Sequence, residues 1–166
     1  YWFMSGSEDA RILLAHIDKH LSILGEIVTE LDLALEKDVP LLGRTNRTGV
    51  MVASIIESYY TCVETIFLRI SQYFENNLAG DRWHKELLDR MAIAVEKMRP
   101  RVLSDSVYEE LSEMMRFRHF KRYYLGFSYD WERLDLLVTR VRRVHDPLKR
   151  DIAGFMEFLR TLAGER

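Results

Sequence analysis

The stretch TGVMVASIIESYYTCVETIFLRISQYFENN, residues 48–77, decides the fold class of this chain. Its apolar side chains recur at alternating spacings of four and three. They are Val52, Ile56, Tyr59, Val63, Ile66, Ile70 and Tyr73. This period places them on one stripe of an α-helix, because a helix turns once in about 3.6 residues. A helix of about 30 residues is about 45 Å long, and it must bury such a stripe against other elements.

The preceding segment, residues 7–37, has the same period and predicts a second long helix. Its stripe consists of Leu14, Ile17, Leu21, Leu24, Val28, Leu31 and Leu35. SGSE at 5–8 has the spacing of a capping box, which begins a helix. The proline in KDVPLLG, residues 37–43, predicts its end, because proline cannot continue a helix and restricts the residue before it. Two long helices with so short a link predict an antiparallel hairpin.

Shorter helices are predicted after the hairpin. NNLAGD has the composition of a turn, and Asp81 at its end can cap a helix over about 82–98. RPRVLSDS interrupts that pattern. Ser106 and Glu109 then have the spacing of another capping box, which predicts a helix to about Tyr124.

Two further helices are predicted at the end of the chain. Asp130 can cap the first of them, which we expect to run through Val144. Asp146 followed by Pro147 is typical of a new helix start, with an N-cap aspartate and proline at the first helical position. No segment alternates polar and apolar residues as a half-buried strand does. The sequence therefore predicts an all-α bundle, with a long two-helix hairpin and shorter helices packed on it.

Composition predicts one soluble domain. The chain has 166 residues, 48% hydrophobic and 30% charged, with a net charge of −2, so any affinity for nucleic acid must be local. The single cysteine, Cys62, excludes an intrachain disulfide framework and fits a reducing compartment. We see no run of about 18 apolar residues and no secretory signal, and expect a cytoplasmic protein with no membrane contact. We expect residues 1–6 to be a tag remnant or a disordered arm, and residues 7–163 to form the domain.

The stretch RFRHFKRYY, residues 116–124, mixes cationic and aromatic side chains. The cationic ones are Arg116, Arg118, His119, Lys121 and Arg122, and the aromatic ones are Phe117, Phe120, Tyr123 and Tyr124. Arg118 and Arg122 share a helix face, at the place where the apolar stripe through Leu111 and Met115 would continue.

Arginines on that face cost desolvation unless a carboxylate or a phosphate meets them. Arginine binds phosphate through two parallel hydrogen bonds, aromatic rings can stack on unpaired bases, and histidine moves protons near neutral pH. We therefore expect a water-accessible groove whose side chains suit the binding and the cleavage of RNA. The alternative is a solvated basic face whose arginines pair with acids such as Glu110, Glu113 or Asp130, with the aromatic rings in the core.

Three quoted stretches resemble the HepT-like proteins of the HEPN superfamily. They are LSEMMRFRHFKRYYLGFSYDWERLDLLV at 111–138, DRWHKELLDRMA at 81–92 and RPRVLSDSVYEEL at 99–111. The resemblance implies a HEPN-like helical bundle that forms a homodimer. It also implies a metal-independent endoribonuclease toxin, encoded beside a nucleotidyltransferase antitoxin that can adenylylate a tyrosine of the toxin.

The catalytic pattern of that family is an arginine followed four to six residues later by a histidine. Arg118 matches the arginine, but Tyr123 stands at the histidine position and Leu125 at the position of the modifiable tyrosine. Tyr123 and Tyr124 are close enough to replace that tyrosine, and His119 is close enough to replace the histidine. The candidate catalytic residues are therefore Arg118, His119, Arg122 and Tyr123. The candidate RNA-binding residues are Arg116, Lys121, Tyr124 and His84.

Other polar groups are interpreted as structural or open. His84 opens its helix, where it either contacts RNA or the catalytic groups, or packs locally. His16 and His20 are four apart but have no third ligand at a known spacing, so we expect no metal and no cofactor. RVRRVH, residues 140–145, is interpreted as a solvated basic face, with an electrostatic track for RNA as the alternative.

Three functions stay open from the sequence. The first is a toxin component that cleaves or binds RNA. The second is a catalytically inactive HEPN domain that binds a nucleotidyltransferase partner or RNA. The third is a helical interaction module with no role in nucleic-acid binding.

Overall fold

The structure is a computed structural model that describes residues 2–75, 82–123 and 128–165, with side chains for 9–75, 82–120 and 128–165. Within these residues the chain is helical, with one isolated bridge between Val95 and Arg99 and no strand. The prediction of an all-α fold is confirmed. The elements, in chain order, are α1 (Trp2–Leu33), the π-helical turn η1 (Ala34–Asp38), α2 (Val39–Leu42), α3 (Asn46–Phe74), α4 (Trp83–Met91), α5 (Asp105–Tyr123) and α6 (Trp131–Leu162).

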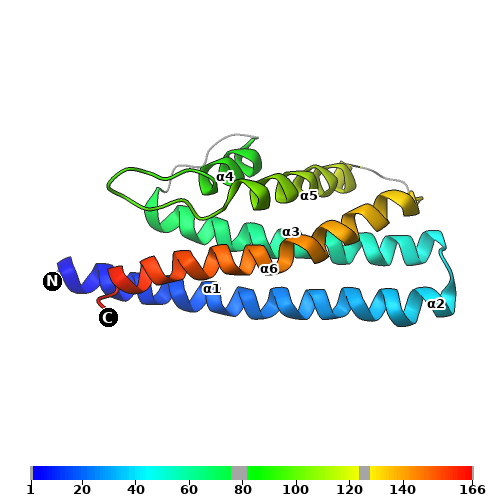
Figure 1. The fold of residues 1–166 in the computed structure, drawn as a ribbon, viewed down its shortest axis with the longest axis horizontal. Coiled ribbons are helices and arrows are strands. Elements are labelled where there is room, and N and C mark those ends of the chain that lie inside the picture. Colours follow the sequence, from blue (N-terminus) through cyan, green and yellow to red (C-terminus); the bar gives the residue numbers. More distant parts are fainter. Residues whose placement is uncertain (1, 76–81, 124–127, 166) are drawn as a thin grey trace.

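The predicted hairpin forms the long axis of the molecule, and α3 is its central helix. α1 and α3 run antiparallel, α6 lies along both of them, and α4 and α5 cover the other side of α3 (Figure 1). The stripe predicted for α3 is buried from Val52 to Ile70, and Ile17, Leu24 and Leu31 of α1 are buried with it. The alternating spacing therefore marked the core of both helices.

The first helix passes Pro40, contrary to the predicted end. The backbone is π-helical over Ala34–Asp38, where the N–H of Val39 donates to the carbonyl of Ala34. Pro40 then falls in the first turn of α2, where a missing N–H is tolerated. The helix ends at Gly43, whose φ of 83° favours glycine.

The N-terminal boundary also differs from the prediction. α1 begins at Trp2, so Ser5 lies inside the helix and is not its N-cap. The helix therefore includes residues 2–6, which were predicted from the sequence to lie outside the domain. At the other side of the hairpin, Thr45 caps α3 and accepts from the N–H of Thr48 at 3.2 Å. The hydroxyl of Thr48 accepts in turn from the N–H of Thr45 at 2.9 Å, which completes a capping box.

The third helix is shorter than predicted and ends at Met91. The carbonyl of Met91 accepts from the N–H groups of Val102 and Leu103, which folds residues 92–104 back as an ordered loop. The guanidinium of Arg99, which has no exposed side-chain surface, bonds Glu75 at 2.8 Å and the carbonyls of Arg90 and Ile93 at 3.0 Å. The contacts of this buried arginine thus stabilise a loop where the sequence pattern predicted a longer helix. Asp81, the predicted cap, lies outside the described residues.

The next helix begins at Asp105, so the predicted cap Ser106 lies in its first turn instead. Ser104 precedes the helix, and both its N–H and its hydroxyl donate to Asp151 at 2.8 Å. This contact fixes the start of α5 against α6.

The last two predicted helices are one continuous helix. Asp130 caps α6 as predicted and accepts from the N–H of Glu132 at 3.0 Å. Pro147, however, lies inside α6 and does not begin a new helix. Val144, Leu148 and Ile152 are all buried, so the continuous helix keeps its apolar stripe on the core on both sides of the proline.

Helix α3 is also long and apolar enough, by length and composition, to cross a membrane. Its most apolar window has a mean hydropathy of 1.2, and 56% of that window is buried within the molecule. The central helix of a bundle passes the same test, so this feature is weak evidence for a membrane span.

Candidate functional site

The last turns of α5 carry the cationic and aromatic stretch, and its side chains divide between core and solvent. Phe117 is buried, whereas Arg116, His119 and Phe120 are exposed. Arg116 forms an ion pair with Glu113, three residues earlier on the same helix. This is the pairing expected of a solvated basic face.

Arg118 extends to α3 and is held there. Its Nε donates to the hydroxyl of Thr61 at 3.0 Å, and its Nη1 lies 3.7 Å from Oε1 of Glu64. The Arg118 side chain is 13% exposed and that of Glu64 is 6% exposed. A buried carboxylate is costly unless cations and donors meet it. Within this chain, Arg118 is therefore engaged by a carboxylate and does not stand free in an open groove.

His84 contacts the same carboxylate from a third helix. It lies in the first turn of α4, and its Nδ1 is 2.7 Å from Oε2 of Glu64. A carboxylate only accepts hydrogen bonds, so Nδ1 carries the hydrogen and Nε2 keeps its lone pair in the neutral ring. The ring of Trp83 stacks on the imidazole at a centroid distance of 3.6 Å. Glu64 thus joins α3, α4 and α5 at one point.

Tyr60 lies beside this cluster in the core. Burial raises the pKa of the Tyr60 hydroxyl, the charge of Glu64 raises it further, and Arg118 acts in the opposite direction. The phenol therefore stays protonated at neutral pH and cannot accept a proton there.

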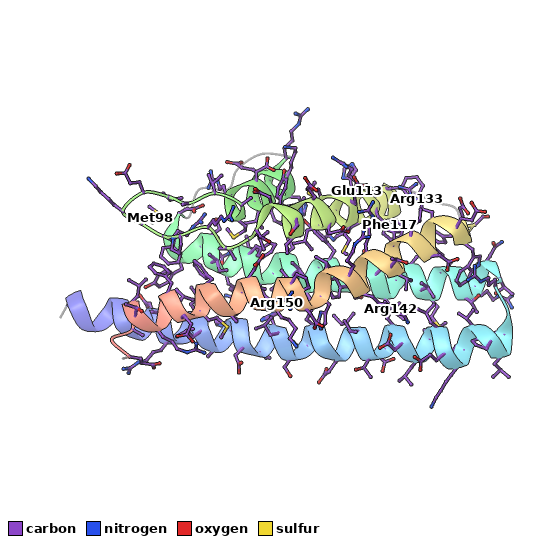
Figure 2. All side chains as sticks on the ribbon, viewed as in Figure 1. Met98, Glu113, Phe117, Arg133, Arg142 and Arg150 are labelled. Carbon is purple, nitrogen blue, oxygen red and sulfur yellow. The ribbon has the colours of Figure 1, made fainter. Side chains whose placement is uncertain are left out.

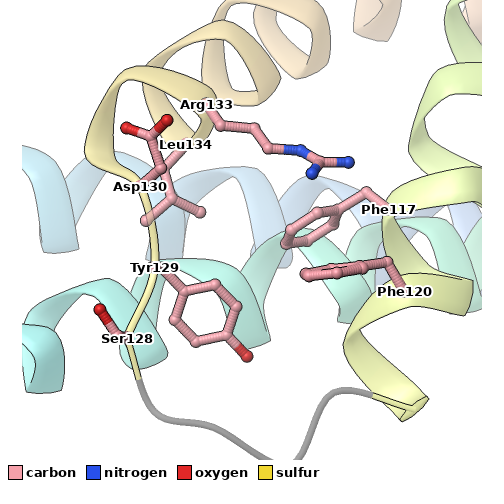
Figure 3. Close-up of a pocket in the computed structure, with 7 residues that line it drawn as sticks. All are labelled: Phe117, Phe120, Ser128, Tyr129, Asp130, Arg133 and Leu134. Carbon is pink, nitrogen blue, oxygen red and sulfur yellow. The ribbon is translucent and has the colours of Figure 1, made fainter.

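A pocket of about 200 Å³ opens between the end of α5 and the start of α6. Its lining residues are Phe117, Phe120, Ser128, Tyr129, Asp130, Arg133 and Leu134. Figure 3 shows the guanidinium of Arg133 extending from α6 toward the phenylalanine rings of α5, with the ring of Tyr129 facing the same space. The guanidinium lies 5.1 Å from the centre of the Phe120 ring. Among the described residues, Arg133 has no carboxylate partner.

Sequence reasoning missed Glu64 and Arg133. Glu64 interrupts an apolar stretch of α3 between Val63 and Ile66, and a charged residue beside the buried stripe was the available signal. Arg133 is one of many surface arginines, and nothing in its local sequence separates it from the others.

Several predicted site residues are not placed. The side chains of Lys121, Arg122 and Tyr123, and the whole of Tyr124 and Leu125, lie outside the described residues. Their roles in catalysis, RNA binding and modification stay predictions.

The arginines of the basic stretch 140–145 form ion pairs with carboxylates of two other helices. Arg140 and Arg143 bond the two oxygens of Glu110 at 3.0 and 2.8 Å. Arg142, labelled on α6 in Figure 2, bonds Asp32 of α1 at 3.1 Å. These pairs connect α6 to α5 and α1.

The remaining histidines and the cysteine are engaged locally. Nδ1 of His20 donates to the carbonyl of His16 at 2.8 Å. Nδ1 of His145 is 3.1 Å from the hydroxyl of Tyr59, and burial lowers the pKa of His145. The described residues hold no cluster of three or more histidine, cysteine, aspartate or glutamate side chains that could bind a metal.

Comparison with known proteins identifies a family. The model of the HepT-like protein family matches residues 51–159, which span most of α3 through nearly all of α6. No curated protein and no solved structure matches the chain. The matched range contains Glu64, His84, Arg118 and Arg133. The chain therefore belongs to the HepT-like family of the HEPN superfamily.

Proposed function

We propose that this protein is the RNA-acting component of a toxin–antitoxin module, a metal-independent endoribonuclease or an RNA-binding toxin. Its membership of the HepT-like family supports the class. The observation that carries the RNA-binding part is the pocket between α5 and α6, where Arg133 approaches the ring of Phe120 and is not neutralised by a described carboxylate.

The chemistry of this pocket suits a single-stranded nucleic acid. Phe120 and Tyr129 offer aromatic surface on which an unpaired base can stack, which contributes about 1–3 kcal/mol per base. The guanidinium of Arg133 offers donors to the neighbouring phosphate. An RNA strand offers both a base that can stack and a phosphate that can accept hydrogen bonds.

If the protein cleaves RNA, the expected reaction is attack of a 2′-hydroxyl on the adjacent phosphate. Arg118 and Arg122 are the candidate cations for the charge that develops on the phosphate. His119 is the candidate for proton transfer on the sequence, together with Tyr123 at the family's histidine position.

One observation favours the second function, an inactive HEPN domain that binds RNA or a nucleotidyltransferase. Arg118, the residue that matches the family's arginine, is held by Glu64 and Thr61 and is largely buried. An arginine committed to a carboxylate binds a phosphate less readily. The nucleotidyltransferase antitoxin and the homodimer are proposals that rest on the family.

RNA binding tests the proposal directly. We expect the purified protein to bind single-stranded RNA with an affinity that falls steeply with salt, because phosphate contacts release counterions. Arg133→Ala should weaken binding about tenfold and lower the slope of log K against log salt by about 1. Arg150→Ala is the matched control, since Arg150 is an exposed arginine farther along α6 (Figure 2) and should bind as the wild type does.

The same protein then separates the two functions. Incubation with RNA in a chelator gives cleavage if the protein is a metal-independent ribonuclease. Binding without cleavage favours the inactive domain. Absence of any salt-sensitive RNA binding would contradict the proposal and leave a helical interaction module.

A further inference from the structure

We propose that His84, held by Glu64 beside Arg118, is the proton acceptor in RNA cleavage by this protein. This inference rests on the proposed ribonuclease function and replaces His119 in the role expected from the sequence. It is carried by the position of two side chains, His84 of α4 and Arg118 of α5, around the carboxylate of Glu64 on α3.

The imidazole of His84 is held in one orientation by Glu64. Glu64 is held in the buried face of α3, and its Oε2 accepts from Nδ1 of His84 at 2.7 Å. This bond fixes both the ring and its tautomer, so the lone pair of Nε2 points away from Glu64. Nε2 makes no hydrogen bond to a described residue and is not among the buried unpaired atoms. With 25% of the side chain exposed, a base is held at the surface by a buried carboxylate.

A cation, Arg118, contacts the same carboxylate as His84. Arg118 approaches Oε1 of the carboxylate whose Oε2 binds His84, which places imidazole and guanidinium on the two oxygens of one group. Arg118 uses Nε for Thr61 and Nη1 for Glu64, so Nη2 has no partner among the described residues. A phosphate oxygen that contacts Nη2 would lie beside the carboxylate that holds His84.

His119 lies on a different face of α5 from Arg118. A helix turns by about 100° per residue, so the side chain that follows Arg118 points to another face of α5. His119 is exposed, whereas Arg118 is turned toward α3. The two residues are adjacent in the sequence but are not directed at the same point.

In the proposed cleavage, His84 moves one proton and the phosphate exchanges one bond to oxygen for another. Nε2 of His84 takes the proton of the ribose 2′-hydroxyl while the 2′-oxygen forms a bond to phosphorus. The bond from phosphorus to the 5′-oxygen breaks, and that oxygen takes a proton from water. The protonated His84 returns its proton to the hydroxide so formed. The products are a 2′,3′-cyclic phosphate and a 5′-hydroxyl end, with no change in oxidation state. Glu64 is a positioning residue, because it acts through His84.

The experiment measures RNA cleavage in a chelator by the full chain. We expect the wild type to leave 2′,3′-cyclic phosphate ends and His84→Asn to cleave about 100-fold or more slowly, since general base catalysis contributes about 10²–10⁴-fold. Asparagine keeps a donor for Glu64 but cannot accept the proton, so the thermal midpoint should stay near that of the wild type. His16→Ala is the matched control, because His16 lies on α1, which contributes no residue to the cluster around Glu64, and it should cleave within about threefold of the wild type.

Added imidazole distinguishes a proton acceptor from a structural group. It should restore part of the activity of His84→Ala and should not affect His84→Asn, whose side chain fills the site. His84→Asn that cleaves as fast as the wild type would overturn the inference, and so would a folded but inactive His84→Ala that imidazole does not restore. A wild type that binds RNA without cleaving it would contradict the ribonuclease function itself, which is a different result.

Discussion

Glu64 is the residue on which the candidate site depends. Glu64 is a charged side chain on the largely apolar buried face of α3. Its burial is tolerated because Arg118 and His84 contact its two oxygens. Arg118 also donates to the hydroxyl of Thr61, which lies one turn before Glu64 on α3. The same contacts that make a buried charge tolerable also orient an imidazole and a guanidinium, so structure and candidate chemistry have a common origin here.

Cys62 gives a prediction at this scale. Its thiol is buried and donates to the carbonyl of His20 at 3.3 Å, and burial raises the pKa of Cys62 to about 11. Because the thiolate is the reactive form, we expect alkylation at pH 8 to be at least about 100-fold slower than for an exposed cysteine. The measurement is the rate of reaction with a thiol reagent. Denaturant should restore the ordinary rate, and fast reaction of the native protein would show that Cys62 is not buried.

Helix α6 shows how packing overrides a local signal. Aspartate followed by proline is typical of a helix start, yet Pro147 lies within a helix that runs from Trp131 to Leu162. Proline in a helix interior costs about 3 kcal/mol, through a lost hydrogen bond and a clash with the carbonyl four residues earlier. Burial of Val144 and Leu148 on one continuous stripe offsets this cost, because a break would turn one of them away from the core.

Replacement of this proline is a test at the scale of the element. We expect Pro147→Ala to raise the free energy of unfolding by about 1–3 kcal/mol, since the helix regains a hydrogen bond but the unfolded chain gains freedom. The thermal midpoint should rise by about 2–4 °C per kcal/mol for a chain of this size. Lys149→Ala, an exposed change in the same helix, should alter stability by less than about 0.5 kcal/mol. A lower midpoint for Pro147→Ala would mean that the fold depends on the proline.

At the scale of the whole molecule, α3 is the helix around which the others are arranged. It contacts α1 and α6 on one side and α4 and α5 on the other (Figure 1). The site lies on the side that α4 and α5 cover. The site is therefore attached to the most buried helix through two of the shorter ones.

Hydrogen exchange tests this arrangement. We expect the amides in the middle of α3 to exchange most slowly, through global unfolding, because every helix packed on α3 must leave before they open. The amides of α4 should exchange faster by local opening, since this helix of nine residues is short and packs against α3 and α5. Mass spectrometry of peptides resolves the two helices. Equal or greater protection of α4 would contradict α3 as the centre of the fold.

The sequence by itself determined the fold class, the long hairpin, the cap at Asp130 and the family, because each is written in a local period or in a short motif. Only the tertiary structure decided that α4 ends at Met91, that α6 continues through Pro147 and that Arg118 meets Glu64. The reason is distance along the chain. Arg118 and Thr61 are 57 residues apart, and His84 and Glu64 are 20 apart. Which carboxylate an arginine meets depends on how helices cross, and no local pattern records that crossing.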